Sequence, residues 1–259
     1  MADTRPTRSP LALLSALVAA ALLAVSCAPS SAAGKQQPPE RPLAVIYDGP
    51  QGCDDCAPAA AKVLREAPQH YQIKFVKAPL KASDLAGAKL YVQPGGGADL
   101  ERTWKDLKGS ADVLRTWVRE GGNYLGLCFG AYLAGSNPGF NLLPGDAGGY
   151  TSSRDAVVDD DRDAVLKVTW RGKPRHMYFQ DGPVFYFERD ADAKGVEVLA
   201  TYPGNNLPAV AVARYGKGRV GVSGPHPEAD ASWYERAGLN NPDGVDPDLA
   251  YDLIKATTD

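Results

Sequence analysis

The chain has 259 residues, of which 44% are hydrophobic and 23% are charged. Its 28 Lys and Arg residues are slightly outnumbered by 31 Asp and Glu residues, which gives a formal net charge of −3. Because nucleic-acid binding needs a basic patch, this balance argues against a nucleic-acid partner. The length is sufficient for one well-cored domain behind an N-terminal leader.

The N-terminus has the features of an exported protein. Two arginines precede an apolar stretch, residues 11–25, that is too short to span a bilayer comfortably. The stretch ends in AVSC, which resembles a bacterial lipobox with alanine at the usual leucine position. We therefore expect residues 1–26 to be a lipoprotein-type signal peptide. Lipidated Cys27 would then anchor the protein at the outer face of the bacterial cell membrane; an ordinary signal peptide, cleaved later and releasing a secreted protein, is the alternative.

Polar, proline-rich sequence follows the leader. We expect residues 27–42 to be a disordered tether and residues 43–259 to form the folded domain. In the first half of this domain, strand patterns at 43–47, 72–76, 89–93 and 124–127 are interleaved with helix patterns at 57–66 and 111–120. Such alternation predicts a parallel sheet with helices on both faces.

The second half has a different pattern, a run of β segments. Strands are expected at 165–170, 175–179, 184–188, 197–202, 209–215 and 219–223. Gly216 lies in a short turn between the last two strands, which predicts a hairpin. Asp246 and Pro247 suit the N-cap and first turn of a final helix. The expected fold class is therefore α/β with added β segments in the second half.

Cys53 and Cys56 lie between the first strand and the first helix. Strand, CxxC and helix in this order are also typical of a thioredoxin-like redox site. In an exported protein, however, a local structural disulfide needs no further function. We expect a disulfide, because a redox site would leave the motifs described next unexplained.

The run GGNYLGLCFGAYLAG places Cys128 between a short strand and a helix start. Gly126 and Gly130 flank the cysteine as in the cysteine form of the nucleophile elbow, a sharp turn that crowds the backbone and exposes the nucleophile. The N-terminus of the following helix would favour the reactive thiolate. A buried structural cysteine is the alternative interpretation.

His226 and Glu228 follow the strand 219–223. His226 could take the proton of Cys128 as a general base, while Glu228 holds the imidazole tautomer and stabilises its cation. The prolines on either side of His226 would stiffen this loop. A solvated loop histidine is the alternative.

The loop PGGG follows the strand 89–93. Its glycines can present backbone N–H groups, so Gly96 or Gly97 could form one half of an oxyanion hole. The N–H group of Phe129 would form the other half. A plain flexible loop is the alternative.

PGGG, GGNYLGLCFGAY and GPHPE, in that order, resemble the class I glutamine amidotransferase-like superfamily. The run QPGGG…VREGGNYLGLCFGAYLAG looks most like the biotin-protein ligase N-terminal domain family. The resemblance implies a flavodoxin-like three-layer sandwich with a mostly parallel central sheet, and a triad of Cys128, His226 and Glu228. Glutamine-hydrolysing members usually carry a His-Gln pair soon after the nucleophile, where this chain has Ala131 and Tyr132, so glutamine is not the expected substrate.

We expect a cysteine-dependent hydrolase or amidase that cleaves an amide or related C–N bond of a small molecule or peptide. The alternatives are a non-catalytic module of the same fold that binds a small ligand, and a thiol-disulfide oxidoreductase that uses Cys53 and Cys56. No cofactor is expected. No metal site is expected either, because the alternating aspartates at 159–163 lack the glycine and the final glutamate of a calcium loop.

One further segment allows two interpretations. Gln180 and Asp181 stand between two aromatic runs. They could line the pocket that faces Cys128, or they could belong to a core strand and its turn. The pattern favours the second interpretation.

Overall fold

The computed structural model describes residues 41–97, 99–190 and 195–259. The predicted signal peptide, Cys27 and nearly all of the expected tether lie outside these residues. Within the described ranges, no helix is long and apolar enough to cross a membrane.

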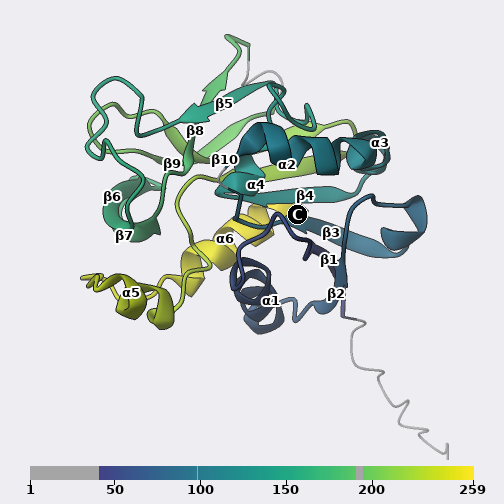
Figure 1. The fold of residues 1–259 in the computed structure, drawn as a ribbon, viewed down its shortest axis with the longest axis horizontal. Helices are drawn as coiled ribbons and strands as arrows, with labels where there is room; N and C mark the ends of the chain where they lie inside the picture. The colour runs from purple at the N-terminus through teal and green to yellow at the C-terminus, as the bar shows by residue number, and fades with distance from the viewer. Residues whose placement is uncertain (1–40, 98, 191–194) are drawn as a thin grey trace, which may run out of the picture. The chain divides into compact units, whose positions relative to one another are not determined.

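The domain is built on a nine-stranded sheet (Figure 1). One side of the sheet is parallel, with strands in the order β2 (Gln72–Val76), β1 (Leu43–Tyr47), β3 (Ala88–Gln93), β4 (Asn123–Leu127) and β11 (Gly218–Ser223). Antiparallel strands continue the sheet from β11, in the order β10 (Pro208–Tyr215), β9 (Glu197–Thr201), β6 (Ala164–Trp170) and β7 (Lys173–Phe179). A separate two-stranded ribbon pairs β5 (Gly145–Gly149) with β8 (Pro183–Phe187).

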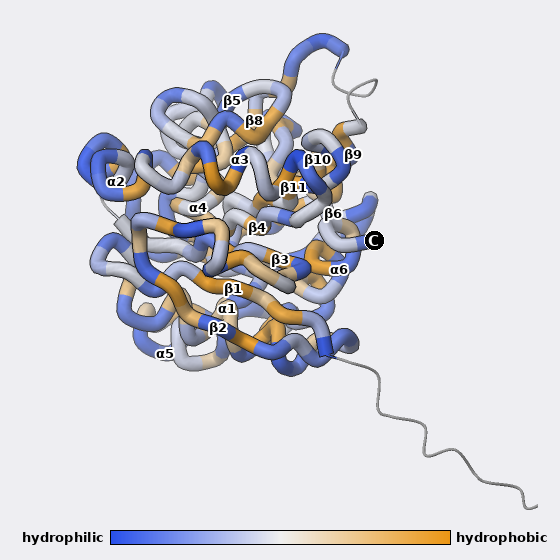
Figure 2. Tube along the Cα trace, turned by 90° about the vertical axis from the view of Figure 1, so that its right-hand side faces the viewer, coloured by the Kyte–Doolittle hydropathy of each residue, from blue (hydrophilic) through white to orange (hydrophobic). Residues whose placement is uncertain are grey.

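Helices cover both faces of the parallel strands. On one face lie α1 (Cys56–Glu66) and α6 (Pro247–Thr258), and on the other lie α2 (Leu100–Leu107) and α3 (Ala111–Arg119) (Figure 1). Successive residues of β1 alternate between the two cores, and Figure 2 shows hydrophobic residues along β1 and β3. Strands buried on both faces are expected of a parallel sheet covered by helices. The three-layer α/β sandwich with added β segments in its second half is confirmed.

The predicted strands and helices are present, with ends that differ by one or two residues. The hairpin between β10 and β11 turns through Gly216, whose φ is +63°. The sequence patterns missed the elements α2, β5, α5 (Ala231–Ala237) and two short 3₁₀ helices, η1 (Ala82–Asp84) and η2 (Lys108–Ser110). The glycine-rich β5 lacks the side chains of a typical strand and exists through its pairing with β8.

Asp246 directly precedes α6, but its side chain makes no capping hydrogen bond. Instead Oδ1 accepts a hydrogen bond from Arg175 Nη2 at 2.7 Å, and Oδ2 accepts one from Asn241 Nδ2 at 3.1 Å. Asp246 is buried, so its carboxylate needs a charged partner more than the helix needs a cap. The expected role of this residue is thus replaced by an ion pair between β7 and the start of α6.

Candidate active site

Cys128 lies at a sharp turn between β4 and α4 (Phe129–Tyr132). Its φ of +48° and ψ of −108° are unusual for a residue other than glycine, and such strain is found at functional sites. A Cβ on Gly126 would lie 2.5 Å from the Gly130 carbonyl oxygen, and one on Gly130 would lie 1.9 Å from that of Gln93. The elbow therefore requires glycine at both flanking positions. Because α4 is a single turn, its dipole at the sulfur is smaller than that of a longer helix.

The elbow is braced by the strand that leads to the candidate base. The N–H group of Cys128 donates to the Ser223 carbonyl oxygen at 2.7 Å. Ser223 ends β11, and three residues later the chain reaches His226. The parallel pairing of β4 and β11 thus brings the two distant motifs to the same edge of the sheet. Ligands of open α/β folds bind at this carboxyl edge.

His226 and Glu228 form a buried pair. His226 Nδ1 lies 2.8 Å from Glu228 Oε1, and each residue is less than 5% exposed. The backbone N–H of His226 donates to the Tyr178 carbonyl oxygen at 2.9 Å. The imidazole packs against the rings of Tyr178 and Trp233, at centroid distances of 5.8 and 5.1 Å. The ring orientation is therefore fixed by a carboxylate, a strand and two aromatic side chains.

Gly95 marks the meeting point of the cysteine and the histidine. A Cβ at Gly95 would lie 3.2 Å from His226 Cε1 and 3.8 Å from Cys128 Cβ. Burial acts to lower the pKa of His226, but the negative charges of Cys128 and Glu228 and hydrogen bonds to both raise it well above its ordinary value. The histidine is thus suited to carry a proton beside a thiolate.

A second contact of Cys128 favours its neutral thiol over its thiolate. Its Sγ lies 3.4 Å from the Gln180 carbonyl oxygen, to which a thiol can donate but a thiolate cannot. The carbonyl stabilises the neutral pair, whereas the carboxylate of Glu228 stabilises the ionised pair.

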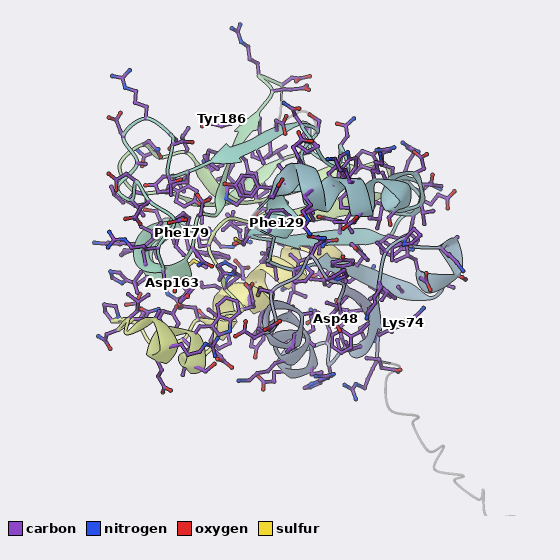
Figure 3. The ribbon with its side chains drawn as sticks, viewed as in Figure 1. Asp48, Lys74, Phe129, Asp163, Phe179 and Tyr186 are labelled. Atoms are coloured by element: carbon purple, nitrogen blue, oxygen red, sulfur yellow. A yellow bond between two sulfur atoms is a disulfide. The ribbon has the colours of Figure 1, made fainter. Side chains whose placement is uncertain are left out.

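A pocket of about 460 Å³ opens at Cys128. The predicted residues Gly96, Gly97 and Phe129 line it together with the cysteine. Phe129, labelled in Figure 3, is the first residue of α4. The size falls within the range of small-molecule sites.

The PGGG loop is held tightly at this pocket. Gly96 and Gly97 have φ values of +121° and +74°, and a Cβ on Gly97 would lie 2.8 Å from the Phe129 ring. Among the described residues, the backbone N–H groups of Gly96 and Gly97 donate to no backbone carbonyl. Free N–H groups beside a nucleophile are what an oxyanion hole requires.

Cys53 and Cys56 form the predicted disulfide. Its position was not expected, because Cys53 lines the Cys128 pocket and Cys56 Sγ lies 3.0 Å from the Cβ position of Gly95. The backbone N of Cys53 would lie 2.3 Å from a Cβ on Gly96. The disulfide-closed loop is therefore part of the wall that supports the PGGG loop.

Within the described ranges, Cys53, Asp55 and Cys56 are the one group of His, Cys, Asp or Glu close enough to hold a metal, and the disulfide occupies both sulfurs.

Parts of this chain are similar to known proteins. The family model described as "Biotin-protein ligase, N terminal" matches residues 43–146, which include the PGGG loop and the elbow. A putative GMP synthase subunit from Thermoplasma acidophilum superposes with a TM-score of 0.56 at 12% identity, covering 84% of this chain and 96% of that one. This structural similarity shows a shared fold, and the family match covers residues 43–146. The resemblance predicted from the motifs, to the class I glutamine amidotransferase-like superfamily and to the biotin-protein ligase N-terminal family, is confirmed.

Two further similarities are more limited. A glutamine amidotransferase of Methylobacillus flagellatus superposes with a TM-score of 0.51 at 12% identity, covering 76% of each chain. An uncharacterized protein of Chlamydia muridarum is 35% identical in an alignment of 141 residues, and the match covers 44% of this chain and 51% of that protein. The chain thus spans about half the length of this relative. His226 and Glu228 lie outside the matched family segment.

Tyr132 stands where glutamine-hydrolysing members of the resembled superfamily carry part of their His-Gln pair, and it lines the pocket. Burial, followed by the charges of Asp181 and Cys128, raises the pKa of Tyr132, so its hydroxyl stays protonated. The hydroxyl donates to the Asp181 carbonyl oxygen at 3.1 Å. Gln180 and Asp181 both line the pocket, so the favoured prediction of a core strand and turn was wrong for their side chains. Their turn between β7 and β8 projects over the elbow, which no local pattern indicates.

Proposed function

We propose that this protein is an exported, lipid-anchored, cysteine-dependent hydrolase that cleaves an amide or related C–N bond of a small molecule or peptide. One observation carries the proposal. Cys128, in a strained backbone conformation, and the imidazole of the buried His226–Glu228 pair lie beside the same glycine, Gly95, and Cys128 lines a pocket of about 460 Å³. This combination of an activated thiol, a base and an orienting carboxylate is that of covalent cysteine catalysis.

The residues divide the reaction between them. The thiolate of Cys128 attacks the carbonyl carbon, and the oxyanion is stabilised by N–H groups of Phe129 and the PGGG loop. His226 gives its proton to the leaving nitrogen as the C–N bond breaks, leaving a thioester on Cys128. His226 then takes a proton from water, which attacks the thioester and releases a carboxylic acid. Glu228 keeps the imidazole oriented through both steps.

The proposal is tested by screening amides and short peptides for hydrolysis and by detecting the acylated enzyme in an intact-mass spectrum. We expect turnover with the wild type, an acyl adduct on the Cys128 peptide, and neither with Cys128→Ala. A retained turnover in Cys128→Ala would contradict the mechanism. If ligands bind equally to the wild type and to Cys128→Ala without turnover, the non-catalytic binding module is the better description. The hydrogen bond from a neutral Cys128 thiol to the Gln180 carbonyl would be consistent with that alternative.

Export and anchoring are supported by the leader sequence and its AVSC ending. The several acyl chains of a mature bacterial lipoprotein hold a protein firmly at a membrane, whereas one chain holds only marginally. We expect the wild type to sediment with membranes and Cys27→Ala to lose the lipidated form, as measured by fractionation and N-terminal mass spectrometry. A wild-type protein that is wholly in the supernatant, with an N-terminus beyond Cys27, would contradict the anchor without contradicting export.

A further inference from the structure

The walls of the Cys128 pocket carry negative charge. Asp161 comes from the loop before β6 and Asp181 from the turn between β7 and β8, and both line the pocket. No Lys, Arg or His is among the described residues that line it. Arg162, the residue after Asp161, pairs with Asp160 at 2.5 Å and lines an adjoining hollow that Asp161 and Gln180 also border, so its charge offsets part of that of Asp161. Asp159, Asp160 and Asp163 border the same hollow, so acidic side chains outnumber basic ones around the pocket.

Asp181 is held in place by hydrogen bonds to its side chain and its backbone. Thr151 Oγ1 donates to its Oδ1 at 2.8 Å, and the Tyr132 hydroxyl donates to its backbone carbonyl at 3.1 Å. Its φ of +43° is uncommon for a residue other than glycine. A side chain whose backbone is strained and whose carboxylate is anchored presents its charge in a defined place.

The remaining walls suit a cation equally well. Phe129 and Tyr132 present aromatic rings, whose faces attract ammonium and guanidinium groups. Tyr132 remains neutral because burial raises its pKa. The Cys128–His226 pair has no net charge, whether as thiol and imidazole or as thiolate and imidazolium. The carboxylate of Glu228 adds a negative charge behind this pair, and the two aspartates add negative charge in the pocket wall itself.

We infer that the pocket selects substrates that carry a positive charge, an ammonium or guanidinium group, near the bond presented to Cys128. This deepens the proposed function by naming its substrate class, and it rests on that function for the kind of bond cleaved. The charge selectivity itself belongs to the pocket and can be measured without turnover.

The probes are three methanethiosulfonate reagents that differ in charge: trimethylammonium-ethyl, hydroxyethyl and sulfonatoethyl. Each transfers its thioalkyl group to the Cys128 thiolate with release of methanesulfinate, forming a mixed disulfide. Modification of the Cys128 peptide is followed by mass spectrometry without reductant, so that the Cys53–Cys56 disulfide stays closed. Rates are divided by those of each reagent with 2-mercaptoethanol, which removes differences in intrinsic reactivity.

We expect the cationic reagent to modify wild-type Cys128 roughly tenfold faster than the anionic one, in the range of electrostatic steering. Asp161→Asn and Asp181→Asn should each lower this rate ratio, and the double variant should lower it most. Added salt should lower the ratio in the wild type. Glu66→Gln, an exposed acid at the end of α1, is the matched control and should leave the ratio unchanged. The rate with the neutral reagent shows whether each variant keeps its site.

A wild-type ratio of one or less, or a ratio that persists in the double variant, would overturn the inference. Failure of the proposed function looks different: Cys128 would show the charge preference while no amide is hydrolysed. Conversely, an amide-hydrolysing enzyme with a ratio near one would keep its proposed function and lose this inference.

Discussion

The two halves of the domain make different contributions to the candidate site. The first half supplies the PGGG loop, the disulfide-closed loop and the Cys128 elbow, all on parallel strands and all within or close to the matched family segment. The second half supplies His226 and Glu228 after β11, and the walls formed by the segments around Asp161 and Asp181. In the proposed mechanism, the first half presents the nucleophile, whereas the second half provides the base and the selectivity.

This division predicts that removal of the base has the largest effect on the nucleophile. His226→Ala removes the partner that stabilises the thiolate, so alkylation of Cys128 by iodoacetamide at neutral pH should slow by roughly a hundredfold, within the range of general acid–base effects. The rate is measured on the Cys128 peptide by mass spectrometry.

His176→Ala is the matched control for this experiment. His176 lies on β7, where its Nδ1 is 3.1 Å from Asp243 Oδ2, and it does not line the pocket. Its variant should label at the wild-type rate. Equal slowing in both variants would mean that the effect comes from general destabilisation, and equal labelling of His226→Ala and wild type would end the assignment of the base.

The contact between the halves can be tested at Gly95. A Cβ there would lie 3.0 Å from Cys56 Sγ and 3.2 Å from His226 Cε1, both closer than ordinary contacts. Gly95→Ala should therefore displace the imidazole and slow Cys128 alkylation by about tenfold, as small misplacements of catalytic groups do. In Gly109→Ala the nearest neighbour would be 3.7 Å away, so this control should keep both the reactivity and the thermal midpoint. Wild-type reactivity of Gly95→Ala would show that the ring has room to move.

The sequence predicted the local motifs of the site better than the contacts that tertiary packing creates, for physical reasons. The elbow is a local motif, because Gly126 and Gly130 are required by backbone contacts within a few residues or with one neighbouring strand. The loop of Gln180 and Asp181 reaches the pocket through tertiary packing, which leaves no periodic signal. Trp233 packs on His226 from α5, a helix too short for a clear pattern. The disulfide was predicted from spacing alone, and spacing carries no information about the pocket beside it.

The smallest expected effect is a pH dependence of stability that joins the two halves through charge. The pKa of His226 is raised in the folded protein, where burial is outweighed by the charges of Cys128 and Glu228, from an unfolded value of about 6.5. The charged imidazole therefore stabilises the fold fully below about pH 6.5, and this contribution decreases as pH rises through the folded pKa. In the proposed ion pair, unfolding returns a proton to Cys128 while the imidazole loses one, so the two proton changes cancel up to the unfolded thiol pKa of about 8.5. The free energy of unfolding of the wild type minus that of His226→Gln, from urea titrations at several pH values, should therefore fall only above about pH 8.5, by at most about 1.4 kcal/mol per pH unit. The difference for His176→Gln is the control, since no such buried charge pair surrounds that ring. A wild-type difference that stays flat or grows above about pH 8.5 would show that the elbow of the first half does not hold a proton on the histidine of the second.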